Sequence, residues 1–242
     1  MPVTELVVVA LAVFVASFVQ IIAGFGFALL CMPIMTIAIP VERAVIISTL
    51  MGVFAVTWQA WYLRKDADLS LVRRLSLSAF VGMPLGLFVL HVLSDQSLRL
   101  ALGVAVLIAT ALLARRINLT ASGPSLDYSA GFLSGVLNTS LSTNGPPLVF
   151  ALQARHLEPD TFRATINMVF ALSNVVTIAL FFADGAVTLD GATAAAIALP
   201  AWALGQLAGF PLRSKLQGEA FRRLVLALLF IAGSSSIIFA LV

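Results

Sequence analysis

Residues 128–154 read YSAGFLSGVLNTSLSTNGPPLVFALQA, a stretch without Asp, Glu, Lys or Arg. It is longer than the roughly 20 apolar residues that a membrane-spanning helix needs, but glycines, two adjacent prolines and a polar cluster interrupt it. Unwound backbone persists inside a bilayer only where protein shields it or where it lines a cavity. We therefore expect this segment to be broken and to mark a functional site.

Charged residues divide the rest of the chain into further apolar runs. The 242 residues are 61% hydrophobic and 10% charged, whereas a soluble domain would carry about 25% charged residues. One run, 6–41, is too long for a single crossing and contains glycine and proline, so we expect it to be broken as well. The other runs suit one crossing each: 44–63, 75–94, 100–114, 164–183, 191–212 and 224–242. The sequence predicts an all-α polytopic membrane protein.

The distribution of Lys and Arg predicts the topology, because cytoplasmic loops collect these residues. If all eight runs crossed in alternation, the 14 basic residues would divide six inside to eight outside. If residues 128–154 instead enter and leave on the cytoplasmic side, twelve lie inside and two outside. We therefore predict a re-entrant segment here and, by symmetry, a second one at 6–41 that enters from outside and places the N-terminus outside.

Short sequence echoes at an offset near 120 suggest that the two halves are inverted copies. Gly82-x3-Gly86 resembles Gly205-x3-Gly209, and Glu42-Arg43-Ala44 resembles Phe162-Arg163-Ala164. We expect an N-terminal repeat at 1–118, a linker at 119–126 and a C-terminal repeat at 127–242, together forming one transport domain. Each repeat would hold a broken or re-entrant segment and three transmembrane helices. Inverted repeats with interrupted helices are common in secondary transporters, whose substrate site lies where the breaks meet.

Neutral groups dominate both predicted breaks. None of the eight apolar runs contains a carboxylate, which a cation site at membrane depth would normally recruit. The N-terminus of a half-helix presents N–H groups and partial positive charge, so two facing breaks would suit a small oxyanion. The candidate substrate-binding residues are Gln20, Gly24, Phe25, Gly26, Asn138, Ser140, Ser142, Thr143, Asn144, Gly145, Asn167 and Asn174.

Several of these residues allow a structural interpretation as well. The polar cluster at 138–144 would also suit helix capping or bonding to the backbone of its own helix. Asn167 and Asn174 share one helix face and would either line the pathway or join helices. Arg43, Arg163 and Trp58 are candidates for an entrance or gate, although arginines at such positions often reach lipid headgroups and tryptophans often form an interfacial belt.

Other classes of function lack the residues they need. Cys31 is the single cysteine, which excludes a disulfide framework and a multi-cysteine metal site. A surplus of three positive charges is too small and scattered for a nucleic-acid surface. The chain carries no hydrolase triad, HExxH, P-loop or dinucleotide motif, so we expect no enzyme, cofactor or metal site. The expected partners are a small anion and the lipid bilayer, with a homodimer as an open alternative.

At its glycine-and-proline segments the sequence resembles the sulfite exporter family TauE/SafE, also called TSUP. The resemblance rests on Gly24-Phe-Gly26-Phe with Pro33, and on Gly131-Phe-Leu-Ser-Gly135 followed by Asn144-Gly145-Pro146-Pro147. It implies a multi-pass permease that moves sulfite, sulfoacetate or other organosulfonates across a bacterial inner membrane, usually outward. The alternatives are a channel or carrier for another small solute, and a non-transport membrane partner subunit.

Overall fold

The computed structural model describes residues 1–23, 26–114, 123–153, 155, 157–212 and 219–241, and the elements in these ranges are all helices. They are α1 (Val3–Ala23), α2 (Phe27–Met35), α3 (Val41–Leu63), α4 (Leu69–Val92), α5 (Asp95–Ala114), α6 (Pro124–Leu141), α7 (Gly145–Gln153), α8 (Pro159–Ala183), α9 (Leu189–Gly209), the 3-10 turn η1 (Phe210–Leu212) and α10 (Glu219–Leu241). The predicted all-α class is confirmed.

Six of these helices are long and apolar enough to cross a membrane, which confirms a polytopic membrane protein. They are α1, α3, α4, α5, α8 and α9 with η1. The set includes α1, because the first break falls late, near Gly26, and leaves 21 continuous helical residues before it. The first half of the predicted linker 119–126 lies outside the described residues, and its last residues, from Pro124, form the start of α6.

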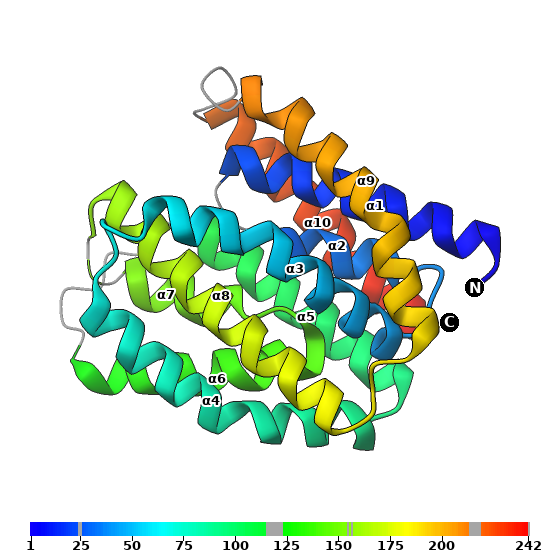
Figure 1. Ribbon diagram of the computed structural model, residues 1–242, viewed down its shortest axis with the longest axis horizontal. Helices are drawn as coiled ribbons and strands as arrows, with labels where there is room; N and C mark the ends of the chain where they lie inside the picture. Colours follow the sequence, from blue (N-terminus) through cyan, green and yellow to red (C-terminus); the bar gives the residue numbers. More distant parts are fainter. Residues whose placement is uncertain (24–25, 115–122, 154, 156, 213–218, 242) are drawn as a thin grey trace.

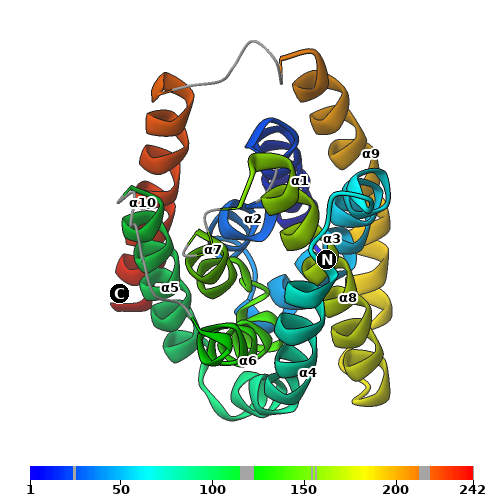
Figure 2. The same ribbon diagram turned by 90° about the vertical axis from the view of Figure 1, so that its left-hand side faces the viewer.

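Both segments expected to be broken are broken. The chain follows one order twice: a long helix, a short helix of nine residues, then three long helices. A nine-residue helix is only about 14 Å long, less than half the thickness of a bilayer core. The two short helices, α2 and α7, lie in the interior with the long helices around them (Figure 2).

Left-handed residues produce the two breaks. Gly26, the N-cap of α2, has a φ of 96°, which glycine adopts readily because it has no Cβ. Ser142 ends α6 with a φ of 54° and is the non-glycine residue with positive φ in the described part of the chain. The Thr143 N–H donates to the carbonyl of Leu137, six residues back, at 3.2 Å. This is the Schellman pattern that terminates helices.

Each interrupted segment begins and ends at the same end of the molecule. Asp127, in the first turn of α6, accepts hydrogen bonds from Arg155, which follows α7, at 2.7 Å and from Arg74 of α4 at 2.9 Å. Glu5, in the first turn of α1, lies 3.5 Å from Arg43, near the start of α3. Because Arg74 follows the end of α3 and Arg43 lies at its start, these two helical hairpins enter from opposite ends of α3.

Small residues allow the outer helix pairs to pack closely. A Cβ on Gly82 would collide with the Phe132 carbonyl of α6, and a Cβ on Gly135 would collide with the Ala79 carbonyl of α4. In the second half, a Cβ on Gly205 would lie 2.6 Å from the Phe14 carbonyl of α1. α4 and α6 lie side by side, as do α1 and α9 (Figure 1). The glycine pairs noted in the sequence therefore serve helix packing.

Helices at equivalent places in the two halves run antiparallel to each other. The Asp68 N–H, just after α3, donates to Thr165 Oγ1 near the start of α8 at 3.0 Å, so the end of α3 meets the start of α8. Gln96 Nε2, at the start of α5, donates to the Ala240 carbonyl at the end of α10 at 2.6 Å. These two antiparallel pairs bring the halves together around the short helices.

Candidate functional site

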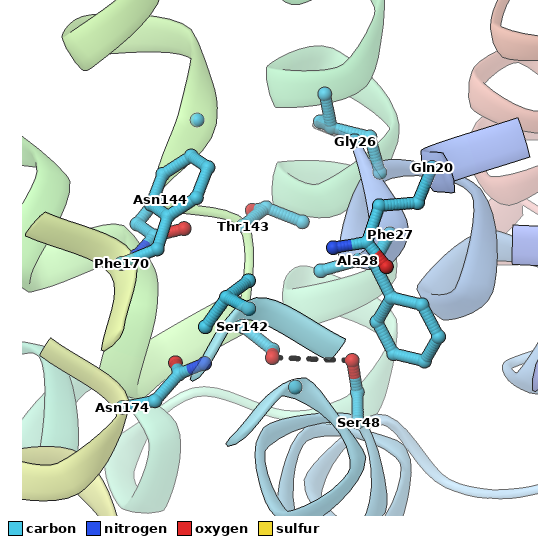
Figure 3. A pocket seen from close by; sticks show the side chains of 14 residues that line it. Gln20, Gly26, Phe27, Ala28, Ser48, Ser142, Thr143, Asn144, Phe170 and Asn174 are labelled. Carbon is cyan, nitrogen blue, oxygen red and sulfur yellow. Dashed lines mark hydrogen bonds between the residues drawn. The ribbon is translucent and has the colours of Figure 1, made fainter. Parts of the chain in front are cut away.

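A narrow cavity of about 40 Å³ lies where the two helix breaks meet. Figure 3 shows residues from both breaks facing this space, with side chains of α3 and α8 completing the wall. A water molecule needs roughly 10–15 Å³ of such a cavity, so this one has room for a few atoms. The lining residues are Gln20, Gly26, Phe27, Ala28, Leu29, Ser48, Gly52, Val56, Ser142, Thr143, Asn144, Gly145, Phe170 and Asn174.

The first break contributes mainly backbone. Phe27, Ala28 and Leu29 form the first turn of α2 and all line the cavity. N–H groups in the first turn of a helix have no acceptor within that helix, and they give this end a partial positive charge. Gln20 is the polar side chain on this wall: its Nε2 donates to the Ala55 carbonyl at 3.2 Å, and it is 1% exposed. The Gln20 donor is therefore taken by the backbone and its Oε1 is left without a partner among the described residues, so the free donors of this wall are the N–H groups of α2, which carry no formal charge.

The second break contributes mainly side chains. Pro146 and Pro147, in the first turn of α7, have no N–H group, so this helix start presents fewer backbone donors than α2. Ser142, Thr143 and Asn144 line the cavity at this point. Among the described residues, the buried Asn144 Nδ2 and Thr143 Oγ1 have no hydrogen-bond partner. An unpartnered buried donor costs about 1–3 kcal/mol, which a ligand that accepts hydrogen bonds would recover.

Helices α3 and α8 close the remaining sides. Ser48 lies within 3.2 Å of the Ser142 hydroxyl, the hydrogen bond drawn in Figure 3. A Cβ on Gly52 would lie 2.8 Å from Asn174 Nδ2, so the absence of that carbon leaves room for the Asn174 amide. Among the described residues that line the cavity, none carries a formal charge. The site therefore offers neutral donors and apolar surface.

Most predicted site residues lie around this cavity, but not all. Gln20, Gly26, Ser142, Thr143, Asn144, Gly145 and Asn174 line it, while Gly24 and Phe25 fall outside the described residues. Asn138 donates from Nδ2 to Thr177 Oγ1 at 2.7 Å, Ser140 to the Val136 carbonyl at 2.7 Å, and Asn167 to the Arg163 carbonyl at 2.8 Å. Asn138, Ser140 and Asn167 therefore make contacts within and between helices, the alternative role considered for them, and they do not line the cavity.

Part of the wall comes from residues that carry no polar signal in the sequence or only a weak one. Ser48, Gly52 and Val56 recur every four residues, so they share one face of α3. This small-residue spacing was the available signal, but the same spacing is common in helices that pack against other helices. Phe170 and the residues after Gly26 were missed for a similar reason, because apolar side chains give no sign of a polar cavity.

The candidate gate residues do not line the central cavity but two further cavities, one toward each end of α3. Arg43 lines a cavity of about 410 Å³ at the start of α3, together with Glu42 and Asp190. Arg163 and Trp58 line a cavity of about 490 Å³ at the end of α3. The described residues contain no group of three His, Cys, Asp or Glu side chains that could hold a metal ion.

Multi-pass helical proteins with interrupted hairpins that meet at a shielded cavity form a class of membrane transport proteins. The chain belongs to the sulfite exporter TauE/SafE family, whose family model matches residues 9–236. It is 24% identical over 234 residues to a Cupriavidus necator protein named "Probable sulfite/organosulfonate exporter TauE", covering 90% of this chain and 88% of that protein. No solved structure matches. Members of the family are transporters, which confirms the expectation that this protein is not an enzyme.

Proposed function

We propose that this protein is a permease for small sulfur-containing anions, sulfite or organosulfonates, and that it exports them across the bacterial inner membrane. The observation that carries the proposal is the central cavity, where two helix breaks meet and where the described lining residues are uncharged. The name of the Cupriavidus necator relative supports the same class of substrate. A small solute of another class remains the second candidate.

The proposed anion is held by neutral donors. Its oxygens accept from the N–H groups in the first turn of α2 and from the side chains of Asn144, Thr143 and Asn174. Hydrogen bonds to a charged acceptor contribute about 1.5–3 kcal/mol each, so three or four would offset much of the cost of removing a small anion from water. A cation would find no negative charge here, because no described lining residue is a carboxylate.

The narrow cavity favours a small headgroup. With a volume of about 40 Å³, it suits sulfite or the sulfonate end of a larger molecule. An organosulfonate needs additional room for its carbon chain. We therefore infer that longer substrates place the sulfonate between the breaks.

We further propose an inverted repeat, made of residues 1–118 and 127–242. Hairpins that enter from opposite ends of α3, together with antiparallel α3 and α8, support this arrangement. Export needs no coupling ion in this scheme, because a monovalent anion leaving a negative interior gains about 2.3 kcal/mol per 100 mV. The absence of carboxylates from the apolar runs also argues against proton coupling through Asp or Glu.

Flux into liposomes tests the proposal. Purified protein should move charge when a gradient of sulfite or ethanesulfonate is imposed, and Asn144→Leu should reduce the flux by at least tenfold, because it removes an unpartnered donor. Gln153→Leu is the matched control: it also replaces an amide side chain by leucine, at the far end of the short helix α7 that Asn144 precedes, and Gln153 lies outside the three cavities described. A wild-type protein that moves no sulfur anion, or equal flux in both variants, would contradict the proposal.

A further inference from the structure

The cavity at the end of α3 has a composition unlike that of the central one. It lies between the last turns of α3 and α9, beside α1 and near the start of α8, and its volume is about 490 Å³. Its polar lining residues are Trp58, Gln59, Tyr62, Arg163, Trp202 and Gln206. All six side chains carry N–H or O–H donors, and among the described lining residues there is no Asp or Glu.

Three of these donors are buried without a partner. Within the described part of the chain, Gln59 Nε2, Gln206 Nε2 and Trp202 Nε1 make no hydrogen bond. The indole nitrogen can only donate, so no rotation of the ring turns it into an acceptor. The three come from two different helices, α3 and α9, and line the same cavity as the Arg163 guanidinium. A group with several acceptor oxygens and a negative charge would satisfy this set of donors.

The remaining wall is apolar and includes the rings of Phe54 and Phe210. Phe54 of α3 packs against Trp202 of α9 with ring centroids 6.2 Å apart. Leu207, near the end of α9, and Phe210, the first residue of η1, also line the cavity and are exposed. This surface suits a hydrocarbon chain rather than a free inorganic ion. The aromatic rings alone would also suit a quaternary ammonium group, but Arg163 in the same cavity would repel a cation.

A thin wall separates this cavity from the central one. Gln20 lines the central cavity while its neighbour Ile21 lines the outer one, and Val56 and Ala55 are divided in the same way. The Gln20 side chain crosses this wall and donates to the Ala55 carbonyl at 3.2 Å. The cavity at the other end of α3 is different in charge, because Glu42 and Asp190 line it together with Arg43.

We propose that the cavity at the end of α3 is a second binding site, which takes an oxyanion carried on an apolar tail. Arg163, Trp202 and the amides of Gln59 and Gln206 bind the oxyanion, and the rings of Phe54 and Trp58 contact the tail. The ligand is a free alkyl sulfonate or the headgroup of an anionic lipid, which share this chemistry. The site does not depend on the proposed function of the central cavity, since binding here can be measured without transport.

Tryptophan fluorescence of the full-length protein tests the site. Trp61→Phe removes the tryptophan that stacks under Arg64 and leaves Trp58 and Trp202, both in the cavity, as reporters. We expect saturable quenching by alkanesulfonates, with affinity rising about two- to fourfold per methylene from ethane- to hexanesulfonate as the tail is buried. Hexyltrimethylammonium, with the same tail and the opposite charge, should not bind.

Variants identify the donors. Gln206→Leu and Trp202→Phe should each weaken hexanesulfonate binding about tenfold, the usual effect of losing a hydrogen bond to a charged group, while Gln153→Leu should bind like wild type. Thermal unfolding of each variant tests whether it is folded. If Gln206→Leu does not fold, Trp202→Phe still tests the site, because phenylalanine keeps an aromatic ring at this position. Equal binding of the cation, or wild-type affinity in both donor variants, would overturn the proposal.

Nanodiscs distinguish the two sources of ligand. If a lipid headgroup occupies the site, adding phosphatidylglycerol to a phosphatidylcholine disc should weaken hexanesulfonate binding, and Arg163→Gln should remove the difference. If the ligand is a free anion, both discs should give the same affinity. Either outcome supports an oxyanion site. A wild-type protein that binds hexanesulfonate but moves no sulfite would contradict only the proposed function of the central cavity.

Discussion

Gly52 and Gly135 both face a neighbouring helix, but they affect different properties of the protein. At Gly52 the nearest atom to an added Cβ is Asn174 Nδ2, at 2.8 Å, the end of a side chain in the central cavity. At Gly135 the added carbon would meet the backbone carbonyl of Ala79. A side chain can move aside, whereas packed backbone cannot. We therefore expect substitution of Gly52 to affect anion binding and substitution of Gly135 to affect stability.

Gly52→Ala should impair transport without destabilising the fold. The new methyl group displaces the Asn174 amide, and we expect the apparent affinity for sulfite to fall about tenfold, the effect of one lost hydrogen bond to an anion. The helix itself gains up to about 1 kcal/mol from the replacement. Flux in liposomes and thermal unfolding measure the two effects. In an Asn174→Ala background the same substitution should have no further effect on flux, and a full effect there would show that Asn174 is not involved.

Gly135→Ala should give the opposite result. Overpacking at a rigid contact costs about 1–3 kcal/mol, so we expect α4 and α6 to separate and the melting temperature to fall. The flux per folded molecule should change little, because neither Gly135 nor Ala79 lines the central cavity. A variant that unfolds like wild type would show that this helix contact is looser than the structure indicates.

The residue types in the second break were predictable, but their individual roles were not. Ser142, Thr143 and Asn144 stand out because polar residues are rare in an apolar run, and all three line the cavity. Asn138 and Ser140 stand out equally, yet they bond to Thr177 and to the backbone of α6. Which of two neighbouring polar residues faces a cavity depends on the rotation of the helix. That rotation is set by contacts such as Gly135 with Ala79, which no local pattern reveals.

At the level of single elements, the α6–α7 hairpin is fixed by a buried carboxylate. Asp127 is fully buried and accepts from Arg74 and Arg155, whose side chains are about a quarter exposed. Arg155 also donates to the Gly123 carbonyl at 3.1 Å, which joins the start of α6 to the chain after α7. The Glu5–Arg43 pair at the other hairpin is longer, at 3.5 Å, and more exposed.

Asp127→Asn should therefore destabilise the protein far more than Glu5→Gln. Breaking a buried ion pair costs about 3–5 kcal/mol, and because water can reach both arginines we expect about 2–3 kcal/mol for Asp127→Asn. Exposed pairs contribute about 0–1 kcal/mol, which is the range we expect for Glu5→Gln. Denaturant unfolding in detergent would measure both. Equal effects of the two substitutions would mean that burial of Asp127 does not determine its contribution.

The breaks themselves were predicted because they leave a strong local signal. Prolines, glycines and a polar cluster interrupt runs that are otherwise free of charge, and helices do end there, at Ser142 and before Gly26. The length of α1 was not anticipated: its 21 residues are enough for a crossing. The break falls at the glycine motif 24–27 singled out in the sequence, because α1 ends at Ala23 and α2 begins at Phe27. That motif does not specify whether the helix before it crosses the bilayer, which depends on the contacts of α1 with other helices.

For the whole molecule, the contacts agree with the arrangement inferred from charge. Arg74 and Arg155, which the positive-inside distribution places on one side, both contact Asp127. The Lys and Arg content of the loops predicts which loops lie on the same side of the membrane. The contacts of α3 with α8 and of α5 with α10 are seen only in the structure. The membrane side of each end stays a prediction.

Thiol labelling tests that prediction. In a Cys31→Ala background, which removes a buried thiol, Leu157→Cys lies between α7 and α8 and Ala186→Cys lies between α8 and α9. We expect a membrane-impermeant maleimide applied from the periplasmic side to label Ala186→Cys and not Leu157→Cys. The reverse pattern, or labelling of both, would refute the predicted re-entry of residues 128–154 from the cytoplasm.

The most direct measurement is the position of a bound anion between α2 and α7. Selenite has the shape and charge of sulfite, and its selenium gives an anomalous diffraction signal that locates the ion in crystals of the wild-type protein. We expect one strong peak bounded by the first turn of α2 and by Ser142, Thr143 and Asn144, and we expect Asn144→Leu to abolish it. A saturated crystal with no peak there, or an unchanged peak in Asn144→Leu, would contradict the account.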